Sequence, residues 1–377
     1  MGKKVAITGI GVNFSNIPDV NALIRTMNGE TEYSRTDHDE VKTFKNRKIK
    51  KLLAKGEKFF CDSAISAVHD SGILKADVAK ERRGIFIGTT KESSSRFELL
   101  NVLKSIYDGE IRYTEFPQAV LENMSPLFVI KSLPNACLHY AAEEFDIRGS
   151  NSLFITNGVA GSQAVATAYH SIMRGDCTWC LAGGFDSHME EDEFYNYEQY
   201  GLKTGCLSDE KSSEVLSEGA GSLIMEDYEH AVLRKARIYG EVIGHGEVFL
   251  NLENDEAKNM GILKRGIFKS LDMAGKDEKD IDFINVDGSS YRNYNRIEKN
   301  VIQDIFSDVP QIDLKKVLGN LVGAASVAEI VADLNILHKK ININNNLAHG
   351  NTLKTFMKLS FGFGGEVSII IIRRNEL

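Results

Sequence analysis

The chain has no apolar run approaching the ~20 residues that a membrane-spanning helix needs, so we expect no membrane partner. It also lacks the layout of a secretory signal peptide, because MGKKVAITGIGV enters a predicted strand at once. Cysteine is scarce, and five cysteines among 377 residues favour a reducing compartment over a disulfide framework. These absences together predict a cytoplasmic protein.

Positive charge is also in deficit. The formal net charge is −8, which argues against a nucleic-acid backbone as the main partner. A basic run at residues 45–51 departs from this balance, and we interpret it as a solvated face. The length is enough for two domains or for one large duplicated domain with a substantial core.

The stretch from residue 152 to 186 organises the chain. Its composition predicts a buried strand at Ser152–Thr156, a tight turn at Asn157–Gly161 and a helix at Ser162–Arg174 that ends before Gly175. A second buried strand follows at Trp179–Gly184. Such a turn at a helix N-terminus suits a nucleophile, since the helix end lowers the pKa of a thiol. Gly158, however, brings no side chain to this turn.

The second half of the chain repeats this plan. A strand is predicted at Ile281–Gly288, a turn and helix at Lys315–Lys339, and a glycine-rich hairpin with a final strand at Leu359–Arg373. The repetition indicates an internal duplication of α/β layers, with halves at residues 1–235 and 236–377. Further strands are predicted at Val5–Val12 and Arg83–Thr89, and a glycine turn that leads into a strand at Glu218–Glu226. Helices are predicted at Phe59–Ser71, which Gly72 closes, at Ser93–Tyr107, and at Pro126–Phe145, where the helix is broken at Pro134 or starts near it.

Other nucleophiles are poor candidates. Ser162 lies one turn into the predicted helix and is expected to face packing. Cys137 and His139 are two residues apart, and side chains at that spacing do not face each other on a helix. We therefore expect both to be ordinary core or surface residues.

Metal and redox sites are equally poorly supported. Cys177 and Cys180 form a CxxC without a second pair, so we expect them to enter a buried strand. Cys61 and Cys206 stand alone. His188 near Glu190 and Glu191 is interpreted as loop surface, and no metal site is expected.

Six segments in order resemble the β-ketoacyl synthase family of the thiolase fold. They are VAITGIGV at 5–12, IRGSNSLFITNGVAGSQA at 147–164, LSEGAGSLIME at 216–226, INVDGSS at 284–290, KKVLGNLVGAAS at 315–326 and SFGFGG at 360–365. The resemblance implies two duplicated βαβαβ halves that form a five-layered α-β-α-β-α core.

The departures from this family bear on the chemistry. By the resemblance, Gly158 stands at the position of the nucleophilic cysteine, Asp287 and Asn320 stand at the two histidines, and Lys315 is retained. A ketosynthase needs a thiolate to carry the acyl chain and donors at the thioester oxygen. Gly158 cannot be acylated, an ionised Asp287 would repel a developing enolate, and Asn320 cannot shuttle a proton. No catalytic residue is intact, so self-sufficient condensation is not expected.

A ketosynthase-like chain without its cysteine is similar to the chain-length factor of type II polyketide synthases. This implies a heterodimer with an active ketosynthase subunit, an acyl carrier protein as a further partner, and no cofactor of its own. The partner would use substrates carried on phosphopantetheine, and this chain would limit the length of a polyketide or aryl polyene. By the resemblance, Leu99, Leu100 and Leu103 are candidates for the tunnel wall, and Phe361 and Phe363 for its mouth. Plain core packing is the alternative for the leucines.

Two other functions remain open. One is a ketosynthase scaffold recruited for acyl transfer or thioester hydrolysis, with Asp287 as the base. The other is a non-catalytic homodimer that binds acyl chains. For the basic run at residues 45–51, the alternative to a solvated face is a docking site for an acidic carrier protein.

Overall fold

The computed structural model describes residues 3–14, 17–30, 47–90, 97–187, 215–251, 253–288, 294–341 and 353–375. Its strands form one ten-stranded sheet in the order β3-β2-β4-β5-β1-β6-β10-β9-β7-β8. The strands are β1 (Val5–Phe14), β2 (Arg83–Thr89), β3 (Asn151–Ile155), β4 (Trp179–Asp186), β5 (Gly219–Asp227), β6 (Gly240–Phe249), β7 (Phe283–Asn285), β8 (Gln311–Ile312), β9 (Thr355–Phe361) and β10 (Glu366–Arg373).

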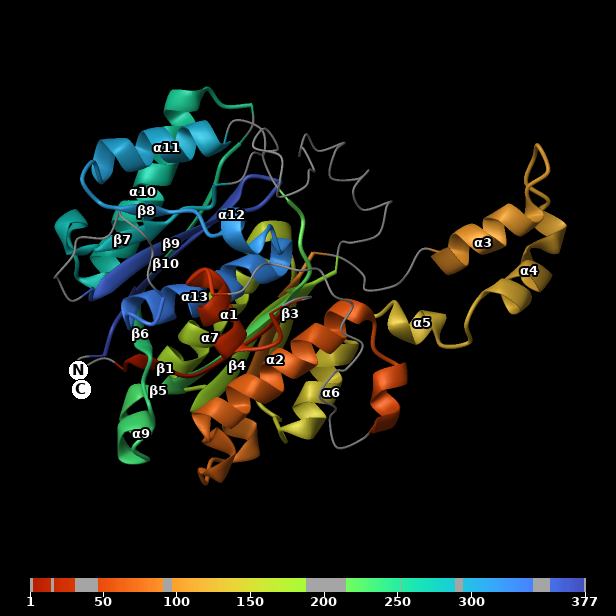
Figure 1. Ribbon diagram of the computed structural model, residues 1–377, viewed down its shortest axis with the longest axis horizontal. Helices are drawn as coiled ribbons and strands as arrows, with labels where there is room; N and C mark the ends of the chain where they lie inside the picture. Colours follow the sequence, from red (N-terminus) through yellow and green to blue (C-terminus); the bar gives the residue numbers. More distant parts are fainter. Residues whose placement is uncertain are drawn as a thin grey trace.

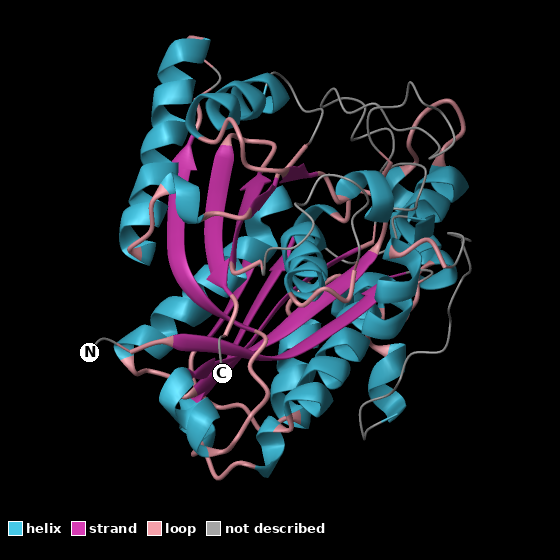
Figure 2. Ribbon diagram, turned by 60° about the vertical axis from the view of Figure 1, so that its left-hand side comes forward, coloured by secondary structure: helices cyan, strands magenta, loops and turns pink. Residues whose placement is uncertain are grey.

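The strand order shows the duplication directly. Adding five to each number in β3-β2-β4-β5-β1 gives β8-β7-β9-β10-β6, which is the other half of the sheet read from its own edge. The pairings agree as well, since β2 and β7 are each flanked by two parallel strands, while β5 and β10 are antiparallel to both neighbours. The halves join where Val5–Ile7 pairs with Gly240–Val242, and Figure 2 shows their strands running in different directions. The predicted duplication is confirmed.

Helices form three layers around the two halves of the sheet (Figure 1). On the outer face of the first half lie α2 (Lys55–Ser71) and α6 (Ala136–Glu144), and on that of the second half lie α10 (Glu256–Ala274) and, packed on it, α11 (Tyr294–Ile305). Between the halves, α7 (Ala160–Arg174) and α13 (Ala325–Leu337) contact strands of both. Every residue of α13 is buried, as a helix in the central layer requires. The five-layered core is therefore present.

The remaining helices are short. They are α1 (Val20–Met27), α3 (Phe97–Ile106), α4 (Phe116–Asn123), α5 (Phe128–Lys131), α9 (Tyr228–Leu233) and α12 (Lys315–Leu318), with 3-10 turns η1 (Arg47–Lys51), η2 (Ile73–Lys75), η3 (Lys80–Arg82), η4 (Tyr113–Glu115), η5 (Asn157–Val159), η6 (Glu278–Asp280) and η7 (Val322–Ala324). Across the described ranges, no helix combines the length and apolar character needed to cross a bilayer.

Glycine ends the long helices as the sequence predicts. Gly72 follows α2 with φ 60°, and Gly175 follows α7 with φ 79°, both in the left-handed region that glycine enters without steric cost. The predicted break near Pro134 is also present, because α5 ends at Lys131 and α6 begins at Ala136.

Two expectations need correction. Residues 152–156 were predicted to form a buried strand, but β3 lies at the edge of the sheet and Ile155 is 51% exposed. The helix predicted at residues 93–107 is α3, which packs on α4 in an arm that projects from the body (Figure 1). Residues 91–96 lie outside the described residues. On α3, Val102 and Ile106 are buried against α4, while Leu99, Leu100 and Leu103 are 40%, 40% and 38% exposed and so are not core residues of the chain alone.

Candidate functional site

Two equivalent turns meet at the centre of the molecule. The turn η5 leads into α7 and the turn η7 leads into α13, and η5 and η7 are in contact. Each turn begins with a non-glycine residue in the left-handed region, Asn157 with φ 53° and Val322 with φ 46°. Since such a conformation is uncommon outside glycine, its occurrence in both turns extends the duplication to the backbone of the site.

Glycine permits this close approach. A Cβ atom on Gly161 would lie 2.7 Å from Ser326 Oγ and 2.8 Å from the carbonyl oxygen of Gly323. A Cβ atom on Gly184, at the end of β4, would lie 2.5 Å from the same oxygen. These distances are below van der Waals contact, so the close approach of the two turns requires glycine at both positions.

Asp186 fixes the second turn in place, a role that the sequence analysis missed. Its carboxylate is 1% exposed and accepts hydrogen bonds from the backbone N–H of Gly323 at 2.6 Å and from the Thr89 hydroxyl at 3.0 Å. The backbone N–H and hydroxyl of Thr90 donate to the same carboxylate at 3.1 and 2.9 Å. An acidic residue directly after the GGF of a buried strand was the available signal.

At the position of the expected nucleophile, the backbone leaves no room for a side chain. A Cβ atom on Gly158 would lie 2.3 Å from the carbonyl oxygen of Phe361 and 3.4 Å from its carbonyl carbon. The obstructing oxygen belongs to the backbone, so a rotamer change does not relieve the collision. The sequence predicts that the thiol is missing; the structure adds that the space for it is filled.

Asp287 is buried in an ion pair. It is 2% exposed, and its Oδ1 atom lies 2.6 Å from Lys315 Nζ and 3.0 Å from the backbone nitrogen of Phe361. Lys315 Nζ also donates to the backbone carbonyl of Asp287 at 2.9 Å. Burial alone would raise the pKa of the Asp287 carboxyl, but the charges of Lys315 and Lys358 outweigh burial and hold that pKa below its usual range.

Glu298 of α11 supports the same segment from behind. Its two carboxylate oxygens accept the backbone N–H groups of Asp287 at 2.7 Å and of Gly288 at 3.0 Å. Burial, together with the negative charge of Asp287, raises the pKa of Glu298 to about 7. Two carboxyl groups and one ammonium thus share a buried volume, and Glu298 is the group whose charge changes near neutral pH.

Asn320 performs a backbone role. It is 3% exposed, and its side-chain oxygen accepts the backbone N–H of Val322 at 2.8 Å, which shapes the turn into α13. Its own backbone N–H donates to the carbonyl of Val215 at 2.6 Å. Asn320 therefore joins the strand region before β5 to the second turn.

A second buried ion pair lies deeper and was not foreseen from the sequence. Lys358 of β9 pairs with Glu329 of α13, and both side chains are 1% exposed. Next to them, Asn285 Nδ2 donates to Asp333 Oδ2 at 2.8 Å. Burial raises the pKa of the Asp333 carboxyl well above its ordinary value. The only sign of this cluster in the sequence is the presence of charged residues inside otherwise apolar helix and strand segments.

The alternative nucleophiles are placed as the residue spacing indicates. Ser162 is 1% exposed and donates to the carbonyl of Val159 at 2.8 Å. Cys137 is fully buried, and its thiol points to the carbonyl of Pro134. Burial raises the pKa of the Cys137 thiol well above its ordinary value, which opposes a thiolate.

The CxxC cysteines are buried at the start of β4. A hydrogen bond from the Cys180 thiol is the main cause that lowers the pKa of Cys177 to about 6, but neither sulfur is reached by solvent. Within the described ranges, no group of three His, Cys, Asp or Glu side chains could hold a metal ion. His188, Glu190, Glu191 and Cys206 lie outside the described residues.

The proposed tunnel residues fall in two places. Phe361 is 4% exposed beside Gly158, and Phe363 is half-buried in the turn after β9. Leu99, Leu100 and Leu103 lie on the arm, with exposed fractions of 40%, 40% and 38%. The structure of the chain alone does not bring these leucines to Gly158.

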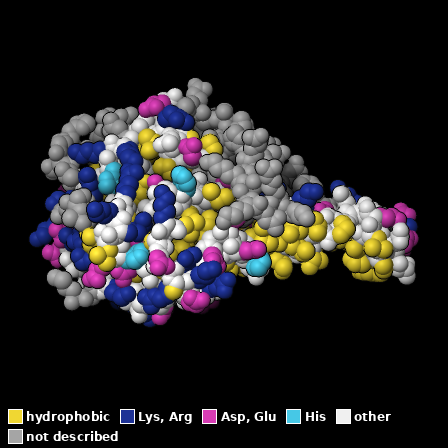
Figure 3. Space-filling view, turned by 90° about the horizontal axis from the view of Figure 1, so that it is seen from below, with side chains coloured by type: hydrophobic (Ala, Val, Ile, Leu, Met, Phe, Trp, Pro, Cys, Tyr) yellow, Lys and Arg dark blue, Asp and Glu magenta, His cyan; other side chains and the backbone are white. Residues whose placement is uncertain are grey.

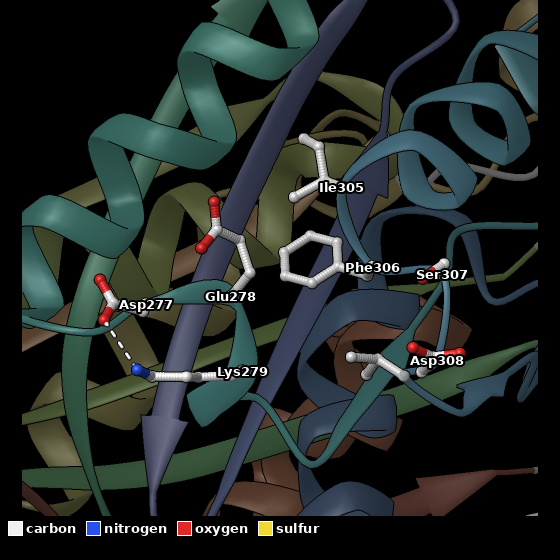
Figure 4. Close-up of a pocket in the computed structure, with 8 residues that line it drawn as sticks. Asp277, Glu278, Lys279, Ile305, Phe306, Ser307 and Asp308 are labelled. Carbon is white, nitrogen blue, oxygen red and sulfur yellow. Dashed lines mark ion pairs between the residues drawn. The ribbon is translucent and has the colours of Figure 1, made fainter.

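A separate hollow lies on the outer side of the second half (Figure 4). It has a volume of about 390 Å³ and lies between η6 and the end of α11. Asp277 and Lys279 at its rim form an ion pair at 3.7 Å. The residues around Gly158, Asp287 and Asn320 do not line it, so it is not part of the central site.

Comparisons with known proteins agree along the chain. Residues 46–231 match the model of the β-ketoacyl synthase N-terminal domain, and residues 239–347 match that of the C-terminal domain. The chain is similar to a 3-oxoacyl-[acyl-carrier-protein] synthase 2 of Staphylococcus aureus, with 24% identity over 99% of each chain. It is also similar to a putative polyketide β-ketoacyl synthase 1 of Streptomyces halstedii, with 25% identity over 82% of this chain and 79% of the relative.

Solved structures show the same fold. The ishigamide ketosynthase/chain length factor matches with a TM-score of 0.79 and 22% identity, over 100% of both chains. A type II polyketide synthase ketosynthase in complex with its acyl-carrier protein matches with a TM-score of 0.78 and 22% identity, again over 100% of both chains. At this level of identity the match shows the architecture.

Proposed function

This chain belongs to the β-ketoacyl synthase family, and we propose that within it the chain is a non-catalytic subunit of the chain-length-factor type. One observation carries the proposal: at Gly158 the nucleophile is absent and the backbone of Phe361 fills its place. Without a thiolate the growing chain cannot be held as a thioester. Condensation therefore requires a second subunit that supplies the cysteine.

The environment of Asp287 disfavours the acyl transfer and hydrolysis alternative. A general base works best when its pKa is near the operating pH and its oxygens can reach the proton to be removed. The pKa of Asp287 is shifted down, and its Oδ1 atom is occupied by Lys315 Nζ and the Phe361 N–H. A carboxylate held in this way is a weak base.

The surface supports a partner of the same fold. Among the described strands, β3 pairs with β2 alone, so its outer edge presents backbone donors and acceptors that another strand can pair. Figure 3 shows apolar side chains gathered on the arm, where Tyr107, Tyr113, Leu121 and Val129 are 60%, 76%, 78% and 70% exposed. Contiguous exposed apolar surface of this kind marks an interaction site. We propose that an active ketosynthase covers it.

The chain-length role follows from this placement. If the partner covers the arm, Leu99, Leu100 and Leu103 become part of a wall between the subunits. An acyl chain grows by two carbons in each condensation, and it stops where the side chains ahead of it leave no volume. The acyl carrier protein delivers substrate to the partner, and this chain limits how far the product extends.

Reconstitution tests the proposal. The full chain is purified alone, and also together with a ketosynthase whose cysteine is intact, and each preparation is given malonyl-loaded acyl carrier protein. We expect carbon–carbon bond formation only with both subunits. Condensation by the chain alone would refute the proposal. A native mass of two copies of this chain with bound lipid would favour the homodimeric acyl-binding alternative.

A further inference from the structure

Two features of the central site, the bare Gly158 and the buried Asp287, meet at one segment. The segment is the turn at residues 361–365 that joins β9 to β10. Gly158 leaves space that the Phe361 carbonyl oxygen fills, and Asp287 accepts the Phe361 backbone N–H at 3.0 Å. The same residue of the turn is thus held from both sides of its backbone.

The hydrogen bonding of β9 explains why Asp287 is needed there. On one side β9 pairs with β10 as far as Phe361, and on the other side its pairing with β7 ends at Lys358. Beyond Lys358 no strand residue of β7 meets the N–H of Phe361. Asp287 lies two residues beyond the end of β7, and its side chain provides the acceptor at this point and so continues the row of hydrogen bonds.

Lys315 orients the carboxylate. Its Nζ atom binds both Oδ1 and the backbone carbonyl of Asp287, at 2.6 and 2.9 Å, and Lys315 is 9% exposed. In a buried site such charge-assisted bonds are strong and directional. The Asp287 carboxylate therefore joins three separate segments, which are the residues after β7, the helix α12 and the end of β9.

We propose that the Asp287–Lys315 pair is a clasp that holds the 361–365 turn closed over residue 158. The closed turn excludes an acyl thioester from the central site of this chain. Gly158 and Asp287 then act together. The glycine leaves room for the 361–365 turn, and the carboxylate holds the turn there through the Phe361 N–H. Restoring a thiol at residue 158 alone does not restore an accessible nucleophile. This inference concerns the chain alone and holds whether or not the proposed function does.

An introduced thiol tests the closure. The variant Gly158→Cys is treated with iodoacetamide, and the alkylated cysteine is located by peptide mass mapping. Cys61, Cys137, Cys177 and Cys180 are buried, so they contribute little background, and the peptide map separates any label on Cys206, which lies outside the described residues. We expect the introduced thiol to react about tenfold faster or more when Asp287→Ala and Lys315→Met are added. Without the ion pair the 361–365 turn opens more often, and each opening exposes the thiol to the reagent.

A matched control separates the clasp from general loosening. Lys264 of α10 and Asp304 of α11 form an ion pair at 2.8 Å in the same half of the fold, with side chains 35% and 49% exposed. Adding Lys264→Met and Asp304→Ala to Gly158→Cys should leave the alkylation rate within about twofold, since exposed ion pairs contribute little. Equal rates in the clasp variant and this control would overturn the proposal.

Gly158→Cys collides with a backbone oxygen, so a second measurement avoids it. Amide hydrogen exchange of the peptide that spans residues 359–365 is compared between the natural chain and Asp287→Ala/Lys315→Met. We expect the exchange of the Phe361 amide to rise at least about tenfold, while α10 and β4 stay unchanged. Unchanged exchange at Phe361 would reject the clasp regardless of how the cysteine variant folds.

Discussion

Lys358 of β9 and Glu329 of the central helix α13 form a buried ion pair, and each side chain is only 1% exposed. Lys358 Nζ also lies 3.4 Å from Asn285 Oδ1, and Asn285 in turn donates to Asp333. The pair therefore belongs to a polar chain that runs from β9 through β7 to α13. It underlies the Asp287 site, because the charge of Lys358 contributes to the lowered pKa of Asp287.

The first prediction concerns this pair. Removing one partner leaves a buried charge without compensation, so Lys358→Met should lower the free energy of unfolding by about 3–5 kcal/mol. Lys358→Met combined with Glu329→Gln should recover part of that loss, because neither charge then remains. Urea denaturation of the natural chain, both single variants and the double variant measures the coupling.

An exposed pair provides the comparison for the first prediction. Lys264 and Asp304 lie 2.8 Å apart with side chains 35% and 49% exposed. Lys264→Met should cost no more than about 1 kcal/mol. If Lys358→Met lowered the free energy of unfolding no more than Lys264→Met does, the buried pair would not stabilise the fold as described.

The second prediction concerns pH. The pKa of Glu298 is raised from 4.5 to about 7 in the folded chain, so the folded state binds this proton more tightly than the unfolded state. The contribution of Glu298 to stability is then fully present below pH 4.5 and is lost as pH rises towards about 7. The free energy of unfolding of the natural chain minus that of Glu298→Gln should fall across this window, by at most about 1.4 kcal/mol per pH unit. A difference independent of pH would contradict the assignment.

The third prediction concerns the glycines between the central turns. Gly184→Ala places a Cβ atom 2.5 Å from the Gly323 carbonyl oxygen, and overpacking of this kind costs about 1–3 kcal/mol. Gly261 in α10 is the matched control, because nothing lies within 4 Å of its Cβ position. Gly261→Ala should stabilise the chain by about 0.5–1 kcal/mol through helix propensity. The melting temperature should fall with Gly184→Ala and rise with Gly261→Ala. An unchanged melting temperature for Gly184→Ala would contradict the close approach of the turns.

Local patterns in the sequence were sufficient for much of the fold. The strand predicted at Arg83–Thr89 has the observed bounds of β2, and the glycines after α2 and α7 end those helices as expected. These features depend on residues near one another in the chain. The helices α4, α10 and α11 were not predicted, and the exposure of β3 depends on its place at the edge of the sheet, which the strand itself does not encode.

The candidate site divides in the same way. The absence of a side chain at Gly158 and the carboxyl group at Asp287 can be read directly from the sequence. The closure by Phe361 and the ion pair with Lys315 are not, because these residues lie more than 200 and about 28 positions away along the chain and meet only through the sheet. Glu329 and Lys358 were hidden for the same reason, since each stands as one charge inside an apolar segment.

The fourth prediction concerns the partner surface. Ile155 at the outer edge of β3 is 51% exposed, so Ile155→Lys should leave the stability of the chain alone within about 0.5 kcal/mol. It should weaken association with the ketosynthase, since a lysine on an edge strand opposes strand pairing. Leu74→Lys, at a 47% exposed position on η2, adds the same charge away from that edge and should leave association unchanged. Sedimentation of the mixed subunits measures the complex, and undiminished association would place the interface elsewhere.

The last prediction tests the wall of the tunnel. Leu99→Phe and Leu103→Phe add volume at positions that are 40% and 38% exposed on the arm, where the chain alone tolerates a larger side chain. If these positions face the growing acyl chain in the heterodimer, each change should shorten the products by one or more two-carbon units without abolishing condensation. Leu233→Phe, at an 82% exposed position on α9, makes the same substitution far from the arm (Figure 1) and should leave product length unchanged. Mass spectrometry of the products released by the reconstituted pair gives the lengths. Products of natural length from both arm variants would remove these leucines from the wall, while a shift with Leu233→Phe as well would show that the effect is not specific to the arm.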